Sequence, residues 1–269
     1  MGHVDETSRD EVFASHGALK PFEHFVQLYG ADRTALSINA IRYFLNGLEN
    51  GDALAIIATP ENRRAFCEEL KKLGVDLDAL IRGGQAMILD AEEGLCMFMD
   101  SGRPDPATFR KMIGTKLDAL RAKAVSGEVR AYGEMVGVLW ADRYFTAAMQ
   151  LEDLWNELLA STRSKLFCAY PIDVFGTGFH ACDIDGLLAS HTHMIPADAD
   201  RTLEKSIYQA MDETLGPDNA MAMRSRMDCE IQVSWSATLR AEAVILWLRK
   251  NLTECADTIL GNARQLFTS

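Results

Sequence analysis

Val129-Arg-Ala-Tyr-Gly-Glu-Met-Val-Gly-Val-Leu-Trp140 combines a short strand with an amphipathic helix, and a glycine and a glutamate stand at the break between them. In an open α/β sheet, side chains at the carboxyl ends of the strands line the crevice where ligands bind. A carboxylate there must contact water, pair with another group or bind a ligand, because burying it without a partner costs free energy. Glu134 therefore marks a candidate site. The alternative is that Glu134 only opens a helix, where a negative charge suits the helix dipole.

Other strands alternate with helices on both sides of this stretch. Ala53–Ala58 is a continuous apolar run, typical of a strand that is buried on both faces. Thr59-Pro60 then begins the next helix with a capping residue and a proline at its first position. We expect strands at 24–29, 53–58, 85–90, 129–132 and 165–170. This alternation predicts an α/β fold, a mainly parallel sheet flanked by helices and joined by right-handed crossovers.

Beyond Pro196 the pattern is that of helices only. We expect one helix over 197–215, a turn at Gly216-Pro217, and one long or broken helix over 220–267. Such a helix needs a partner along its apolar stripe, so it should pack as a hairpin or dimerise. The chain thus divides into a flexible arm (1–20), an α/β domain (21–196) and a helical tail (197–269).

Composition and charge are those of a soluble protein that does not bind nucleic acid directly. Of the 269 residues, 48% are hydrophobic and 25% are charged, and the net charge is −12, whereas a nucleic-acid surface needs clustered Lys and Arg. The first 20 residues lack the apolar core of a signal peptide, and no apolar run approaches the roughly 20 residues that span a membrane. The six cysteines form no CxxC pair and fit buried, reduced thiols. We therefore expect a cytoplasmic location without membrane contact.

Sequence motifs for phosphate binding and nucleophilic catalysis are missing. A phosphate loop needs glycines and a lysine, but Ala53–Ala58 is followed by Thr59-Pro-Glu-Asn-Arg-Arg64. Proline there removes an amide, and Glu61 would repel a phosphate. Neither Gly-x-Gly-x-x-Gly nor Gly-x-Ser-x-Gly occurs, and Cys168 lies within an apolar strand as a core residue. These observations disfavour phosphoryl transfer and nucleophilic catalysis.

Histidines and a cysteine near residues 180–193 are the candidates for metal binding. His180-x-Cys182 precedes His191-x-His193, and two histidines two residues apart on a strand share one face. The spacing matches no zinc signature, so we expect no metal there; histidines that hydrogen-bond the backbone or stack at a sheet edge are the simpler interpretation. In a third interpretation, His191 and His193 line a small-molecule pocket or form hinge contacts just before the helical tail.

Polar side chains gather near the predicted strand ends. They are Gln27, Tyr29, Thr59, Asp90, Glu92, Tyr132, Glu134 and Tyr170. Aromatic and amide groups around one or two carboxylates are typical of a recognition pocket, although Asp90 and Glu134 could form an acid–base dyad if they met. Arg130 is a local candidate partner for Glu134. We predict no catalytic residue and a ligand-binding set of Tyr29, Asp90, Glu92, Tyr132, Glu134, Tyr170, His191 and His193.

Seven segments in the same order together resemble the MEDS domain, the methanogen/methylotroph DcmR sensory family, over roughly residues 20–196. The segments are His24–Tyr29, Ala55–Pro60, Leu89–Glu93, Val129–Val136, Leu151–Glu157, Cys168–Pro171 and His191–Pro196. The resemblance implies a RecA/KaiC-type α/β domain that has lost its phosphate loop. Such domains are thought to sense small molecules, often beside histidine kinases or DNA-binding modules. Neither a ligand nor a cofactor is identified by the resemblance.

The sequence thus predicts a non-enzymatic sensory protein for signal transduction or transcription regulation. A small molecule would bind near Glu134, Tyr132, Asp90 and Tyr29, and the helical tail would dimerise or dock a signalling partner. Two other hypotheses remain open. One is an enzyme with an atypical nucleotide or metal site, and the other is an interaction protein whose pocket is vestigial.

Overall fold

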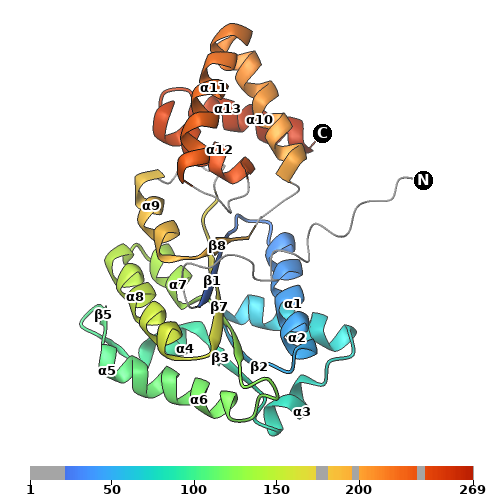
Figure 1. Cartoon of the computed structure of the whole chain (residues 1–269), viewed down its shortest axis with the longest axis vertical. Helices are drawn as coiled ribbons and strands as arrows, with labels where there is room; N and C mark the ends of the chain where they lie inside the picture. Colours follow the sequence, from blue (N-terminus) through green and yellow to red (C-terminus); the bar gives the residue numbers. More distant parts are fainter. Residues whose placement is uncertain (1–21, 174–180, 196–199, 235–239, 269) are drawn as a thin grey trace.

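The computed structural model of the chain describes residues 22–173, 181–195, 200–234 and 240–268 (Figure 1). The flexible arm predicted over residues 1–20 lies outside the described residues.

A six-stranded sheet with the order β3-β2-β6-β7-β1-β8 lies at the centre of the α/β part. Every neighbouring pair in this sheet is parallel, as the sequence predicted. The strands are β1 (Glu23–Leu28), β2 (Ala53–Ala58), β3 (Ala86–Asp90), β6 (Val129–Gly133), β7 (Ser164–Tyr170) and β8 (His193–Met194). Strand β2 is buried along its whole length, because helices cover both faces of the sheet.

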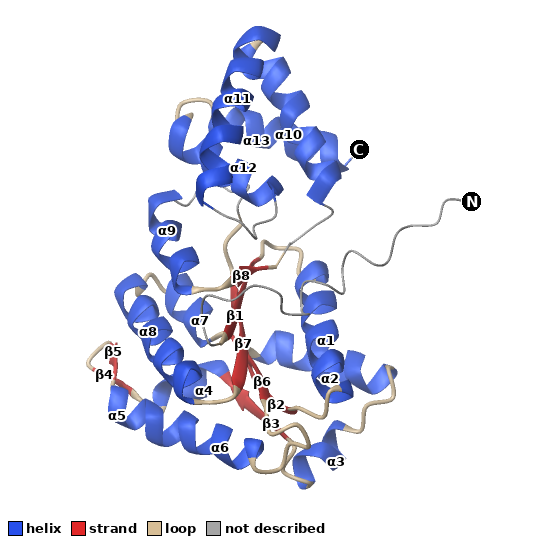
Figure 2. Ribbon diagram, viewed as in Figure 1, coloured by secondary structure: helices blue, strands red, loops and turns tan. Residues whose placement is uncertain are grey.

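Helices α1 (Thr34–Glu49), α2 (Pro60–Lys72) and α3 (Leu77–Arg82) cover one face, which we call the first face (Figure 2). Its core is aromatic: Tyr132 and Phe167 meet Tyr43, Phe44 and Phe66 in edge-to-face contacts. Such aromatic pairs contribute beyond the area that they bury, so α1 and α2 are fixed tightly on the sheet.

The opposite, second face is covered by the remaining helices of the α/β part. They are α4 (Ala91–Cys96), α5 (Pro106–Phe109), α6 (Thr115–Arg121), α7 (Met135–Ala141), α8 (Phe145–Ser161) and α9 (Ala181–Ser190). A short hairpin, β4 (Met99–Asp100) and β5 (Arg103–Pro104), precedes α5. Helices α5 and α6 are joined by a π-helical turn at Arg110–Gly114.

In the described part of the tail, four helices pack together at one end of the molecule, beyond β8 and α9 (Figure 1). They are α10 (Asp200–Leu215), α11 (Pro217–Ser234), α12 (Arg240–Asn251) and α13 (Ala256–Thr268). The expectation of one unbroken helix over 220–267 is therefore wrong, and the broken alternative is confirmed. Helix α12 also contacts α9, so the tail and the second face share one apolar core. None of the described helices combines the length and apolar character that a membrane crossing requires.

Strand β8 is a short edge strand. Only His193 and Met194 pair with β1, opposite Phe25 and Val26. His191 lies before the strand, in the connection from α9.

Candidate functional site

Glu134 lies at the carboxyl end of β6 and is 1% exposed. One carboxylate oxygen, Oε2, accepts a hydrogen bond from the amide of Thr59 at 2.6 Å. The other, Oε1, accepts from the Tyr132 hydroxyl at 2.7 Å and from the Asn62 side-chain amide. Both oxygens thus have neutral donors, which is how a carboxylate can be buried without a cation.

This arrangement differs from simple helix capping. Glu134 stands at the start of α7, but its side chain makes no capping hydrogen bond there. Instead it holds the residues that begin α2, where Thr59 is the N-cap and Pro60 the first helical residue. A negative charge is favourable at a helix N-terminus, so Glu134 fixes the end of β6 to the start of α2.

Tyr29 and Arg33 form the rim of this region. Tyr29 follows β1 and is 7% exposed, and the Arg33 guanidinium lies 5.9 Å from its ring centre. Arg33 also contacts Asn62 Oδ1 at 3.4 Å and pairs with Glu61. Burial, and next the charge of Glu134, raise the pKa of Tyr29, so its phenol stays protonated. We call Tyr29, Thr59, Asn62, Tyr132 and Glu134 the Glu134 cluster.

The sequence interpretation had allowed an ion pair between Arg130 and Glu134, but Arg130 pairs with a different carboxylate. Its Nε donates to Asp52 Oδ2 at 2.9 Å, and its guanidinium lies 5.1 Å from the Tyr43 ring centre. Arg130 is near the start of β6 and Glu134 follows its end, so the strand separates the two charges.

Asp90 and Glu92 do not join the Glu134 cluster through any contact among the described residues. Asp90 ends the edge strand β3, and its Oδ1 accepts from the amides of Glu92 and Glu93 at 3.0 and 3.2 Å. It is thus the N-cap of α4. Glu92 is exposed in the first turn of that helix. Strand β2 lies between β3 and β6, which gives the proposed Asp90–Glu134 dyad no support.

The remaining predicted residues divide between the two faces of the sheet. Tyr132 pairs in register with Phe167, and Tyr170 comes three residues later, so its side chain points to the opposite face. Gln27 is on the first face, where it accepts from Asn39 of α1 at 3.2 Å. The predicted single pocket therefore does not form around all eight residues.

His191 and His193 do not share a face. The His191 ring lies on the second face, 4.1 Å from the ring centre of His24. The His193 ring stacks on Phe25 at 5.1 Å, on the first face. The pair therefore cannot chelate one ion in the way that the i and i+2 spacing allowed. His180 and the side chain of Cys182 lie outside the described residues.

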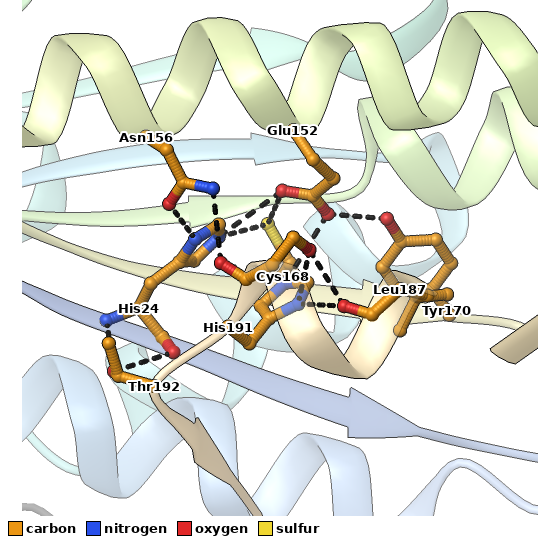
Figure 3. Close-up of polar contacts among 9 residues, drawn as sticks. His24, Glu152, Asn156, Cys168, Tyr170, Leu187, His191 and Thr192 are labelled. Atoms are coloured by element: carbon orange, nitrogen blue, oxygen red, sulfur yellow. Dashed lines mark hydrogen bonds and ion pairs between the residues drawn. The ribbon is translucent and has the colours of Figure 1, made fainter. Parts of the chain in front are cut away.

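A second polar cluster lies on the second face and surrounds Glu152 of α8 (Figure 3). Its members are His24, Glu152, Cys168, Tyr170 and His191, all of them buried. The Tyr170 hydroxyl donates to Glu152 Oε1, and the two imidazoles approach the carboxylate at 3.3 and 3.4 Å. We call these five residues the Glu152 cluster.

The charge state of this cluster follows from its surroundings. Burial opposes ionisation of Glu152, but His191, His24 and the Tyr170 hydrogen bond lower its pKa to about 2. Burial, and then the Glu152 charge, raise the pKa of Cys168 well above its ordinary value. His24, Glu152, Cys168 and His191 each offer one ligand atom, and these atoms lie within 4.8 Å of one another, so they are the described residues that could hold a metal ion.

The sequence interpretation missed His24 and Glu152 and treated Cys168 as core alone. Cys168 is indeed buried in the core, but it also contacts His24. One signal was present for Glu152. It occupies the buried stripe of α8 with Ala148, Leu151 and Trp155, where a carboxylate is unexpected.

The fold defines an α/β protein with a wholly parallel sheet and a helical C-terminal part. The family model "MEDS: MEthanogen/methylotroph, DcmR Sensory domain" matches residues 23–192, and the chain belongs to this family. Both polar clusters lie within the matched residues. Membership in a family of sensory domains indicates a sensory or signalling role.

A segment of 142 residues is also 30% identical to an adenylosuccinate synthetase from Corynebacterium jeikeium (strain K411). The alignment covers 52% of this chain but only 29% of the synthetase. A likeness to less than a third of an enzyme gives little reason to expect its activity here.

Proposed function

We propose that this chain is a non-enzymatic sensory protein that binds a small molecule at the carboxyl edge of β1, β2 and β6 and signals through its helical tail. The match to a sensory domain carries the proposal, because it spans the entire Glu134 cluster. The carboxyl edge of a parallel sheet is also where open α/β folds bind ligands.

Tyr29 and Arg33 are the groups best placed to touch a ligand. Tyr29 retains some exposure at the edge, and the side chain of Arg33 is 37% exposed. A protonated phenol beside a guanidinium favours a small molecule with a carboxylate, carbonyl or hydroxyl oxygen. Glu134 would then act as a positioning residue, since its oxygens already accept from Thr59, Asn62 and Tyr132.

Strand β1 offers a route from this edge to the tail. Tyr29 follows β1 directly, and the same strand pairs with β8, from which the chain continues to the tail. The tail also contacts the α/β part through an ion pair of 3.2 Å between Arg264 of α13 and Asp173. A ligand shifts the tail only if it binds two tail arrangements with different affinities. Such a shift would expose or cover a surface for a protein partner or for a second copy of the chain.

Native mass spectrometry of the full chain, followed by a thermal-shift screen of small carboxylic acids, ketones and alcohols, tests the proposal. A ligand at a hundred times its Kd should raise Tm by roughly 5 °C. Tyr29→Phe and Arg33→Gln should reduce that shift, while the exposed control Glu92→Gln should leave it unchanged.

Hydrogen exchange with and without the compound found in that screen tests the signalling step. We expect changed protection in α10–α13 as well as at the start of α2. No compound that shifts Tm, or equal shifts in Tyr29→Phe and the parent protein, would refute the binding proposal. Unchanged protection in the tail would refute signalling through it.

A further inference from the structure

The Glu152 cluster contains the side-chain types and the spacing of a transition-metal site. We propose that His24, Cys168, Glu152 and His191 bind one Zn²⁺ ion through two imidazole Nε2 atoms, one thiolate and one carboxylate oxygen. This site lies on the opposite face of the sheet from the Glu134 cluster and does not depend on the proposed sensory function.

Neighbouring donor atoms of the cluster lie about as far apart as the ligand atoms of a tetrahedral zinc site. His24 Nε2 lies 3.2 Å from Cys168 Sγ and 3.4 Å from Glu152 Oε2. His191 Nε2 lies 3.3 Å from Glu152 Oε1, and Cys168 Sγ lies 3.9 Å from Oε2. A tetrahedral zinc ion with bonds of about 2.0–2.3 Å holds its ligand atoms roughly 3.3–3.8 Å apart. The four ligand atoms all lie within 4.8 Å of one another, so the widest pair would have to close by up to about 1 Å to seat the ion.

The far nitrogen of each imidazole is held in the way that metal-binding histidines require. His24 Nδ1 lies 3.0 Å from Asn156 Oδ1, and His191 Nδ1 lies 2.7 Å from the Leu187 carbonyl oxygen (Figure 3). The Asn156 amide is oriented by its own donation to the Ser190 carbonyl at 3.0 Å. Both Nδ1 atoms face acceptors, so in the neutral form of each ring the proton lies on Nδ1 and the lone pair of Nε2 points into the cluster.

The surroundings of His191 Nε2 are a second observation that favours a bound cation. It is buried and makes no hydrogen bond with the described residues, although Glu152 Oε1 is only 3.3 Å away. A lone pair facing a carboxylate is unfavourable unless a cation lies between them. A proton on the ring would serve that purpose, and so would a metal ion.

Charge balance favours the divalent ion. The Cys168 thiolate and the Glu152 carboxylate together carry two negative charges, and Zn²⁺ neutralises both within a buried site. Binding exchanges the Cys168 S–H bond for a Zn–S bond and releases that proton to water, with no change of oxidation state. Because four protein groups complete the tetrahedron and all are buried, the site is closed, as structural zinc sites are.

The ion would join parts of the chain that are far apart in sequence. His24 belongs to β1, Glu152 to α8 and Cys168 to β7, whereas His191 lies between α9 and β8, just before the tail. Binding would fix His191, and with it the start of β8, to the body of the sheet.

Elemental analysis of the full chain, and titration of chelator-treated protein with Zn²⁺ and Co²⁺, test this proposal. We expect one ion per chain, and with Co²⁺ the absorption of a tetrahedral site with a thiolate charge-transfer band. Cys168→Ser should lose that band, while the exposed control Cys229→Ser should keep it. Asn156→Ala removes the support of His24 and the hydrogen bond to the Ser190 carbonyl but no proposed ligand, and it should weaken binding about 10–100-fold.

Further variants establish that the ion binds at the Glu152 cluster. His193→Gln should bind the ion as the parent protein does, since His193 lies on the other face. Circular dichroism verifies that each variant is folded. A folded, chelator-treated protein that takes up neither ion would overturn the proposal and leave protonated imidazoles as the partners of Glu152. An unchanged Co²⁺ spectrum in Cys168→Ser would also overturn it.

Discussion

At the scale of single residues, Glu134 and Glu152 are both buried carboxylates, but different groups surround them. Neutral donors from Thr59, Asn62 and Tyr132 surround Glu134. Two imidazoles, a thiol and a phenol surround Glu152. The first environment consists of neutral donors, whereas the second contains groups that can bind a cation. The same residue type therefore has two chemically different environments, and we propose recognition on one face of the sheet and ion binding on the other.

Substitution of Glu134 tests the first environment through stability. In Glu134→Gln, an amide group replaces one acceptor oxygen, so at least one of the three donors that face this side chain loses its partner in a buried place. We expect the free energy of unfolding to fall by about 1–3 kcal/mol. Urea denaturation at neutral pH measures it, with the exposed Glu92→Gln as the matched control. Equal stability of Glu134→Gln and the control would contradict the hydrogen-bonding pattern described above.

At the scale of elements, the local pattern predicted the strands well and their contacts poorly. Apolar runs such as Ala53–Ala58 specify a buried strand without reference to the rest of the chain, and the parallel sheet follows from the spacing of strands and helices. Strand order is a property of the whole fold. The sequence alone therefore could not show that β2 separates Asp90 from Glu134, or that Tyr132 and Tyr170 face apart.

The packing of α7 on β7 depends on a glycine. A Cβ atom at Gly137 would come within 2.4 Å of the Ala169 carbonyl oxygen and 3.1 Å of the Pro171 ring, so backbone would have to move. We expect Gly137→Ala to destabilise the protein by about 1–3 kcal/mol. Gly186→Ala in α9 is the matched control, because its Cβ would meet nothing within 4 Å, and alanine should stabilise that helix by up to about 1 kcal/mol. Thermal denaturation of both variants measures the difference; a Gly137→Ala variant as stable as the parent would show that α7 can shift away from β7.

At the scale of the whole molecule, the tail is part of the structure and not a separate appendage. Leu166 of the sheet, Leu187 of α9 and Leu248 of α12 belong to one apolar cluster. The four tail helices bury their apolar residues against one another within a single chain, which the sequence pattern had left open between a hairpin and a dimer. Dimerisation through the tail stays a prediction, which the molar mass in solution would decide.

A shared core predicts that the tail and the sheet unfold together. Leu248 is fully buried in α12, and Leu248→Ala should cost about 2–5 kcal/mol through lost burial and the cavity that it leaves. Because α12 contacts α9, we expect hydrogen exchange in β2 and in α10 to accelerate in parallel, and calorimetry to show one transition. The exposed Met221→Ala in α11 is the control and should leave both unchanged. Faster exchange confined to α10–α13, or two separate thermal transitions, would mean that the tail opens independently. The sheet could then pass no signal to the tail through their common core.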